Sequence, residues 1–390
     1  RLHLAALGVA VILLVLVALG LTSITRSEES SKATSTQDAN QIFLIGALIV
    51  ILGLLPGWAI GRSVSDFSIL WPDRFGLASM SGAALIIAQL LALVLRSQRV
   101  WVFFMAVLVA ASGAWHVRNL NYNRLSWTTQ QRAYNQLLWR MPDMQEGTIF
   151  ISEVPIMPNM GEYPTAYAIN SLYEQNTDPF NAKSWYSSLS KNYKTGLPGP
   201  EEDQNIHWQH KQIRFDSSLH AMVALEYQHS DSRCLWVLKP SDKHNPYLSP
   251  ADVDIALRSN LDQILGVSPA GYPRWDILGQ EAPHDWCYYY QKADLAWQFE
   301  DWDKITALWA ESEPYRKGIN AWTELSPFLI GALKTGDIEE AKSISSQILN
   351  EREGFKPYLC DIGAAGLDGN DKINPADAAL VLTDLECALR

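Results

Sequence analysis

The chain has 390 residues and a net charge of −11 at pH 7. This length predicts more than one domain, and the acidic balance, without any block of Lys or Arg, argues against binding of nucleic acid through its phosphates. The composition changes near residue 118. The part before it is mostly Leu, Ala, Val and Ile, whereas the part after it is polar, acidic and rich in aromatic residues.

Apolar runs without an Asp, Glu, Lys or Arg fill the first part of the chain. A helix that crosses the hydrocarbon core of a bilayer needs about 20 such residues, and a core helix of a water-soluble protein does not. The runs therefore predict an α-helical membrane anchor of four transmembrane helices over residues 1–118. They cover residues 2–25, 39–61, 75–95 and 100–117.

The chain starts at Arg1 and not at Met. Its first apolar run is longer than the core of a signal peptide, which is about 7–15 residues, and three further runs follow. We therefore expect a fragment of a longer polytopic protein, with part of the function residing upstream of Arg1.

The turn between the third and fourth runs predicts the orientation of the anchor. It holds Arg96 and Arg99 within four residues, and positive charge favours the cytoplasmic side. This places everything after residue 117 outside the cytoplasm, as in an integral plasma membrane protein with an extracytoplasmic C-terminal domain. Small residues, Gly82 and Gly113 among them, gather in the third and fourth runs, so we expect these helices to pack closely on each other or on helices upstream of Arg1.

The pair Asp73 and Arg74 precedes the third run, after Trp71 and Pro72. One interpretation is an interfacial anchor, in which Asp73 lies near a helix N-terminus that favours negative charge. The other is a contact with a lipid-linked phosphate at the membrane face. Charge placement alone leaves both interpretations open.

Residues 119–280 alternate between helix and strand patterns and predict a small extracytoplasmic α/β domain. Pro, Gly, Asn and Lys dominate residues 178–209, which we interpret as a loop. Ser249, Pro250 and Asp252 form the start signal of a helix. Helices are expected at residues 123–140 and 163–173 and after Ser249, and strands at residues 148–152, 212–216, 221–227 and 234–238.

Residues 281–355 have helical spacing and predict two helical hairpins. Their turns begin at Glu300 and Gly336, 36 residues apart, which is close to the tetratricopeptide period of about 34 residues. Residues 356–390 form a tail that ends in a helix with Asn374 as its N-cap. The expected hairpin helices cover residues 286–299, 302–311, 324–334 and 338–350.

The order of these features resembles the C-terminal half of multipass membrane glycosyltransferase-like proteins, including the transmembrane-and-tetratricopeptide O-mannosyltransferases of the GT-C type. Residues 71–82, Asn123 and Trp127 carry this resemblance, and the segment from Cys287 onward is similar to uncharacterised bacterial multipass proteins. The resemblance implies transfer of a lipid-linked sugar to an extracytoplasmic acceptor. In that class the catalytic acid lies in an early outer loop, which this sequence does not contain, so no catalytic residue is assigned here.

Aromatic and acidic residues gather where the α/β domain meets the helical hairpins. A sugar site needs aromatic faces for stacking and carboxylates that accept hydrogen bonds from hydroxyls, but an ordinary domain junction has the same composition. The candidates for sugar or acceptor contact are Trp275, Glu281, His284, Asp285 and Trp286.

The chain has four cysteines, all after residue 118. Outside the cytoplasm they can form two disulfides, with three possible pairings. Cys360 and Cys387 flank the tail and are the favoured pair. Cys234, within an apolar segment, is equally well interpreted as a buried free thiol.

No metal site is assigned. His207 and His210 are three residues apart but have no supporting Cys cluster. Asp368, Asn370 and Asp377 are arranged in part like the ligands of a dockerin-type calcium loop. Such a loop needs an acid at its first place and Gly at its sixth, where this chain has Gly366 and Asp371.

Two hypotheses for the function follow. In the first, the chain supplies late transmembrane helices and an acceptor-binding domain to a glycosyltransferase-like protein, and Asp73 and Arg74 contact the phosphate of a lipid-linked sugar. In the second, it is a non-catalytic membrane-anchored module whose tetratricopeptide-like repeats bind a protein or peptide.

Overall fold

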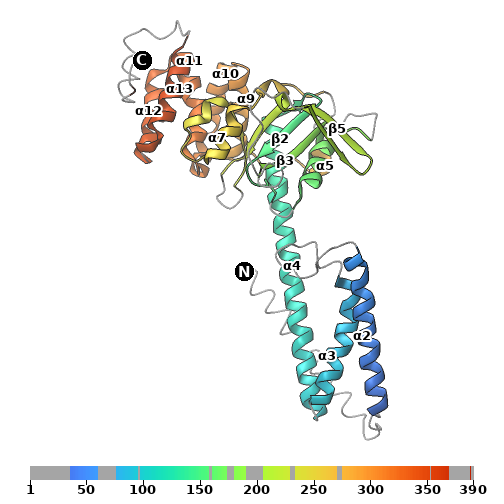
Figure 1. The fold of residues 1–390 in the computed structure, drawn as a ribbon. Helices are drawn as coiled ribbons and strands as arrows, with labels where there is room; N and C mark the ends of the chain where they lie inside the picture. Colours follow the sequence, from blue (N-terminus) through green and yellow to red (C-terminus); the bar gives the residue numbers. More distant parts are fainter. Residues whose placement is uncertain are drawn as a thin grey trace. The chain divides into compact units, whose positions relative to one another are not determined.

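The computed structural model describes residues 36–59, 76–94, 97–157, 160–173, 180–189, 205–228, 233–269, 275–351, 353–368 and 387. The chain divides into two compact units, Arg1–Ser126 and Trp127–Arg390. Their described parts are mostly helical, and the second unit also contains small sheets (Figure 1).

The first unit contains helices α2 (Thr36–Ala59), α3 (Leu77–Val94) and the start of α4 (Gln98–Arg140). Two described helices, Asn40–Ala59 and Arg99–Arg140, are long and apolar enough to cross a membrane, instead of the four predicted. The apolar part of α3, Leu77–Leu91, is shorter than these two helices. At 1.5 Å per residue it spans only about 22 Å. Residues 2–25, and also Asp73 and Arg74, lie outside the described residues.

Helices α2 and α3 lie side by side and touch through their backbones (Figure 1). A Cβ atom added to Gly53 would lie 2.6 Å from the backbone nitrogen of Ser79, and one added to Gly82 would lie 2.8 Å from that of Val50. Small residues therefore create this close contact. We expected the third and fourth apolar runs to pack on each other or on helices upstream of Arg1, but the close packing is between the second and third runs. Helix α4 reaches α3 through Trp101, whose indole N–H donates to the Ala88 carbonyl (3.2 Å).

Helix α4 has 43 residues and runs through the predicted boundary near residue 118. The sequence contains neither Pro nor Gly between Gly113 and Arg140, so nothing stops the helix there. It ends at Arg140 because Pro142 disfavours helical geometry in the residue before it. The second unit therefore begins inside α4, at Trp127.

The second unit is built on a four-stranded sheet with the order β3-β2-β6-β7. Strand β2 runs parallel to β3 and to β6, and β7 is antiparallel to β6. Helix α5 (Glu162–Tyr173) connects β2 to β3. All five residues of β2 are buried, as expected of a central parallel strand. The strands are β2 (Thr148–Ser152), β3 (Ser184–Ser188), β6 (Met222–Glu226) and β7 (Trp236–Leu238).

Strand β3 lies in the stretch that we predicted as a loop. Its residues are fully buried beside β2, so pairing with the sheet overrides the Pro- and Gly-rich sequence around it. The same stretch contains β4, which pairs with β5 in a separate antiparallel hairpin. The remaining strands of this unit are β4 (Asn205–His210), β5 (Ile213–Ser218), β1 (Asp143–Met144) and β8 (Ile264–Leu265).

Helix α7 (Pro250–Leu257) confirms the predicted cap. The Ser249 hydroxyl accepts from the Asp252 backbone N–H (3.0 Å), and the Asp252 carboxylate accepts from the Ser249 backbone N–H (3.2 Å). This reciprocal pair satisfies backbone donors that the first turn of a helix leaves open.

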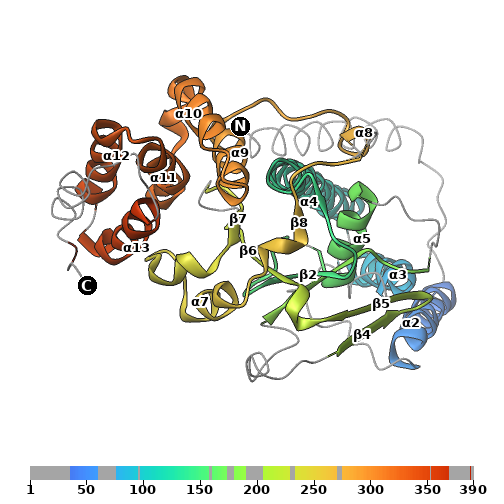
Figure 2. The same ribbon diagram turned by 90° about the horizontal axis from the view of Figure 1, so that it is seen from above.

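The predicted hairpin helices are confirmed as α9 (Trp286–Gln298), α10 (Trp302–Glu311), α11 (Ser326–Thr335) and α12 (Ile338–Glu351). Figure 2 shows them gathered beside β7 together with α13 (Lys356–Leu367), which we did not predict. Helix α13 forms because Tyr358, Leu359 and Ile362 bury one of its sides. The short helix α8 (Trp275–Leu278) precedes α9.

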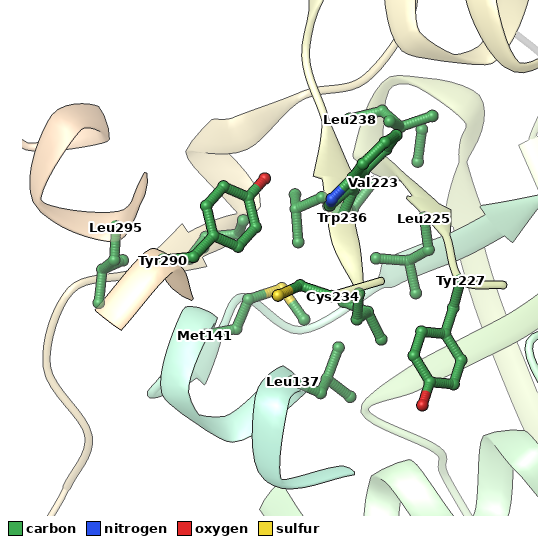
Figure 3. Close-up of a cluster of buried hydrophobic side chains, with 14 of the residues drawn as sticks. Leu137, Met141, Val223, Leu225, Tyr227, Cys234, Trp236, Leu238, Tyr290 and Leu295 are labelled. Atoms are coloured by element: carbon green, nitrogen blue, oxygen red, sulfur yellow. The ribbon is translucent and has the colours of Figure 1, made fainter. Parts of the chain in front are cut away.

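One hydrophobic cluster joins the end of α4, the sheet and α9. Figure 3 shows Leu137 of α4, and Met141 directly after the helix, facing side chains of β6, β7 and α9. The segment before β7 is held from both sides, because the Leu235 N–H donates to Gln136 of α4 (2.6 Å) and its carbonyl accepts from Gln291 of α9. The second unit is therefore packed around the C-terminal end of α4.

Two disulfides close the second unit. Cys360–Cys387 is the pair that we favoured. Cys234–Cys287 shows that interpreting Cys234 as a free thiol was wrong. This disulfide ties the segment before β7 to the first turn of α9. Asp368 follows the end of α13, whereas Asn370, Asp377 and the predicted cap at Asn374 lie outside the described residues.

Candidate functional site

A cleft of about 590 Å³ lies in the second unit between the last turns of α4 and the segment that leads into α9. Residues 278–283 and Asp285 form the wall opposite α4. The residues of α4 that line the cleft are Thr128, Gln131, Arg132, Asn135 and Trp139.

The spacing of residues on α4 explains how the cleft is formed. Gln131, Asn135 and Trp139 are four residues apart and therefore lie on one face of the helix. Gln131 donates to the Leu278 carbonyl (2.9 Å), and Asn135 accepts from the Ala282 N–H (2.9 Å). These bonds fix the opposite wall along its length, so the cleft is preformed.

Glu281 is the carboxylate at the centre of the wall opposite α4. It accepts from the indole N–H of Trp139 (2.8 Å), and His284 Nε2 lies 3.3 Å from the same oxygen. The His284 ring stacks on Tyr288 with 3.5 Å between the ring centroids. Burial, followed by the charge of Glu281, raises the pKa of Tyr288. These contacts hold Glu281 in place while 43% of its side chain stays exposed.

Arg132 and Asp285 bring opposite charges to the cleft. Asp285 is the N-cap of α9 and accepts from the Tyr288 backbone N–H (3.3 Å). Arg132 lies within 4.0 Å of the sulfur of Cys287. Burial raises the pKa of nearby Tyr227. The charge of Arg132 lowers this pKa, and the charge of Asp285 raises it. A guanidinium and two carboxylates thus face a single space.

A buried charge cluster fixes the end of α4 against α9. Arg140, the last residue of α4, and Lys239 each lie 2.6 Å from a carboxylate oxygen of Asp294. Burial alone would raise the pKa of Asp294, but the two cations hold it below its usual value. Lys239 also lies over the ring of Trp297 at 3.3 Å. The two walls of the cleft are positioned by this cluster.

The structure brings some of the predicted sugar-site residues together and separates others. Glu281 and Asp285 line the cleft, and His284 contacts Glu281. Trp275 lies in α8 outside the cleft lining. Trp286 is not part of the cleft lining, because its ring is buried and its indole N–H donates to Glu324 (2.6 Å).

Sequence reasoning missed the residues that α4 contributes. The pattern of residues 123–140 indicated an amphipathic helix, but nothing in it indicated that Gln131 and Asn135 bind a segment 147 residues away. The four-residue spacing of polar side chains was the only available signal.

The described residues contain no group of three or more His, Cys, Asp or Glu side chains that could hold a metal ion. His207 is hydrogen-bonded to Asp216, and His210 is hydrogen-bonded to Tyr167, each at 2.6 Å. The cleft itself offers carboxylates, amides and a guanidinium. These groups suit hydrogen bonding to hydroxyls or to a peptide.

No protein family, curated protein or solved structure matches this chain. The resemblance to glycosyltransferase-like proteins and the tetratricopeptide character of α9–α12 therefore stay predictions.

Proposed function

We propose that this chain is the membrane-anchored, acceptor-binding part of a glycosyltransferase-like protein that takes its sugar from a lipid-linked donor. The observation that carries the proposal is the preformed cleft in which Glu281 and Asp285 face Arg132 and the amides of α4. Its volume of about 590 Å³ suits a ligand of a few sugar or amino-acid units. In this proposal the catalytic acid lies upstream, and Asp73 and Arg74 contact the lipid phosphate.

The disulfides support an extracytoplasmic location for the second unit. Both Cys234–Cys287 and Cys360–Cys387 lie in it, and disulfides persist in oxidising compartments. The pair of arginines at 96 and 99 argues for the same orientation. We therefore place the protein in the plasma membrane with its cleft outside the cytoplasm.

The carboxylates of the cleft bind in this proposal and do not catalyse. Glu281 is held by Trp139 and His284, and Asp285 caps α9. Each keeps acceptor capacity, because a carboxylate has two oxygens and about four lone-pair sites. They would accept hydrogen bonds from hydroxyl or amide groups of the acceptor substrate, while Arg132 would donate to one of its oxygens.

Saturation-transfer NMR on the full chain in detergent tests the proposal. The probes are mannotriose and a Ser/Thr-rich peptide. Glu281→Gln and Asp285→Asn keep the packing and the N-cap but remove charge, and we expect at least a severalfold loss of affinity. Asp303→Asn, at an exposed position of α10, is the matched control. Unchanged affinity in both cleft variants would exclude the cleft as the acceptor site.

The alternative function is a membrane-anchored module that binds a protein or peptide on tetratricopeptide-like repeats. The observation in its favour is an aromatic pair on the helical part, in which Tyr289 and Tyr315 stack at 5.2 Å and 40% of Tyr315 is exposed. If Tyr315→Ala abolishes peptide binding and Glu281→Gln does not, this alternative replaces the first proposal.

A further inference from the structure

A second cavity, of about 580 Å³, lies on the β4–β5 hairpin and shares no lining residue with the cleft at α4. Figure 2 shows the two strands side by side. The cavity is lined by side chains of this hairpin and by the neighbouring residues Phe180 and Asn181.

The strand register gives the hairpin one polar and one aromatic face. Gln209 lies opposite Arg214, and Trp208 lies opposite Phe215. Since successive side chains point to opposite sides of a strand, Gln209 and Arg214 share a face that Trp208 and Phe215 do not. The aromatic pair packs toward Trp185 of β3. The polar face is therefore turned away from the sheet.

Residues 180–182 extend this face by a third row. The Arg214 N–H donates to the Phe180 carbonyl (2.8 Å), and the Ala182 N–H donates to the Arg214 carbonyl (2.9 Å). The backbone beneath the cavity is thus held by hydrogen bonds on both sides of β5. A rigid three-row surface of this kind can present side chains to a ligand without a large ordering cost.

The cavity carries positive charge in a chain of net charge −11. Neither Arg214 nor Lys211 has an ion-pair partner among the residues that the structure describes. The acid in the lining, Asp216, is already bonded to His207 (2.6 Å). An anion entering here would meet two unpaired cations and one carboxylate, so the lining carries a net positive charge.

The turn holds one of these cations in an unusual conformation. Lys211 has a φ of +57°, a left-handed geometry that Gly or Asn adopts more readily. The Gln209 amide donates to the Lys211 carbonyl (3.0 Å) and supports the turn. A lysine at this position costs backbone strain, which a role in binding would offset.

The remaining side chains narrow the class of ligand. Phe180 is half exposed (51%), and Gln209 and Gln212 bring amides to the lining. An aromatic face can stack on a sugar ring, and amides bind hydroxyls. A neutral sugar would make no ion pair with the two cations. A simple anion without a sugar ring would make no contact with the aromatic ring of Phe180 or with the amides. We propose that this hairpin binds a saccharide that carries a carboxylate or a phosphate group.

Calorimetric titration of the full chain in detergent tests this proposal. Trigalacturonate probes the carboxylate form and mannose 6-phosphate the phosphate form, while galactotriose, mannose and inorganic phosphate are the controls. We expect one acidic sugar to bind at least tenfold more tightly than its neutral counterpart and than phosphate. This affinity should fall strongly between 0.1 M and 1 M salt, as the Debye length shrinks from about 10 Å to about 3 Å.

Three variants assign the binding to the hairpin. Arg214→Gln should weaken it about tenfold or more, because it removes a charge-assisted hydrogen bond. Lys211→Gly suits the backbone and should weaken it severalfold, and Phe180→Ala should weaken binding of the sugar but not that of phosphate. Equal affinity for neutral and acidic sugars, or unchanged affinity in Arg214→Gln and Lys211→Gly, would overturn the proposal. Glu281→Gln should leave this binding unchanged, so the two sites are tested separately.

Discussion

The α2–α3 pair and the α4–α9 junction are packed in opposite ways. Helices α2 and α3 meet through Gly53 and Gly82, with no charged group at the contact. Helices α4 and α9 meet through large aromatic side chains and the buried cluster of Arg140, Lys239 and Asp294. In lipid, helices associate by close backbone packing, whereas a junction in water can bury charges if each one has a partner.

The largest effect should come from removing the shared acid of the buried cluster. Asp294→Ala leaves Arg140 and Lys239 buried without a counter-charge, which should lower the free energy of unfolding by about 3–5 kcal/mol. Denaturant unfolding of the full chain in detergent, followed by tryptophan fluorescence, measures this. Asp254→Ala breaks the partly exposed pair with Arg258 and should cost at most about 1 kcal/mol. Equal costs would contradict the distinction between buried and exposed pairs.

Removing the disulfide at the junction should have the next largest effect. Cys234 and Cys287 are 53 residues apart, and closing a loop of that length stabilises by roughly 4 kcal/mol in the chain-entropy description. We therefore expect the Cys234→Ser, Cys287→Ser double variant to unfold at clearly lower denaturant concentration. Cys360→Ser with Cys387→Ser provides the comparison, since that disulfide closes a shorter loop. An unchanged midpoint in the first variant would show that the ion cluster and hydrophobic packing suffice.

Glu324 makes the junction sensitive to pH. Burial raises its pKa to about 7, although the Cys234 N–H, the indoles of Trp286 and Trp236, and Arg233 lower it. Because the pKa in the folded state lies above the usual value near 4.5, its contribution to stability is present at low pH. This contribution is lost as the pH rises through about 7. We expect unfolding to become easier between pH 5 and pH 8, by up to about 3 kcal/mol.

Thermal unfolding of the full chain at both pH values tests this dependence. Glu324→Gln, which does not titrate, should lower the stability at pH 5 and reduce the difference between the two pH values. Burial also raises the pKa of Asp242, to about 6, so part of the difference should persist in this variant. A wild-type chain that is equally stable at both pH values would contradict the role given to Glu324.

The same contrast separates what the sequence could predict from what it could not. Local signals were sufficient for α9, α10 and α12, and for the cap at Ser249, because spacing and capping residues are close together in the chain. The pair Cys360–Cys387 followed from its place around the tail.

Features that depend on distant partners could not be predicted. Strand β3 is stabilised by β2, and helix α13 by its packing on α11. The cleft depends on hydrogen bonds between α4 and a segment almost 150 residues away. Its carboxylates, Glu281 and Asp285, were predictable from composition, whereas the wall that faces them was not.

The smallest effect, and the most direct test of packing in the first unit, should come from Gly82. Its added Cβ would meet the backbone nitrogen of Val50 and the Ile49 side chain at 2.8 and 2.9 Å, so Gly82→Ile should force α2 and α3 apart at a cost of about 1–3 kcal/mol. Unfolding in mixed micelles with increasing sodium dodecyl sulfate measures this cost. Ala84→Ile adds bulk at an exposed position of α3 and should be nearly neutral. Similar costs for both variants would mean that α2 and α3 do not rely on the glycine contact, and the contrast with the α4–α9 junction would fail.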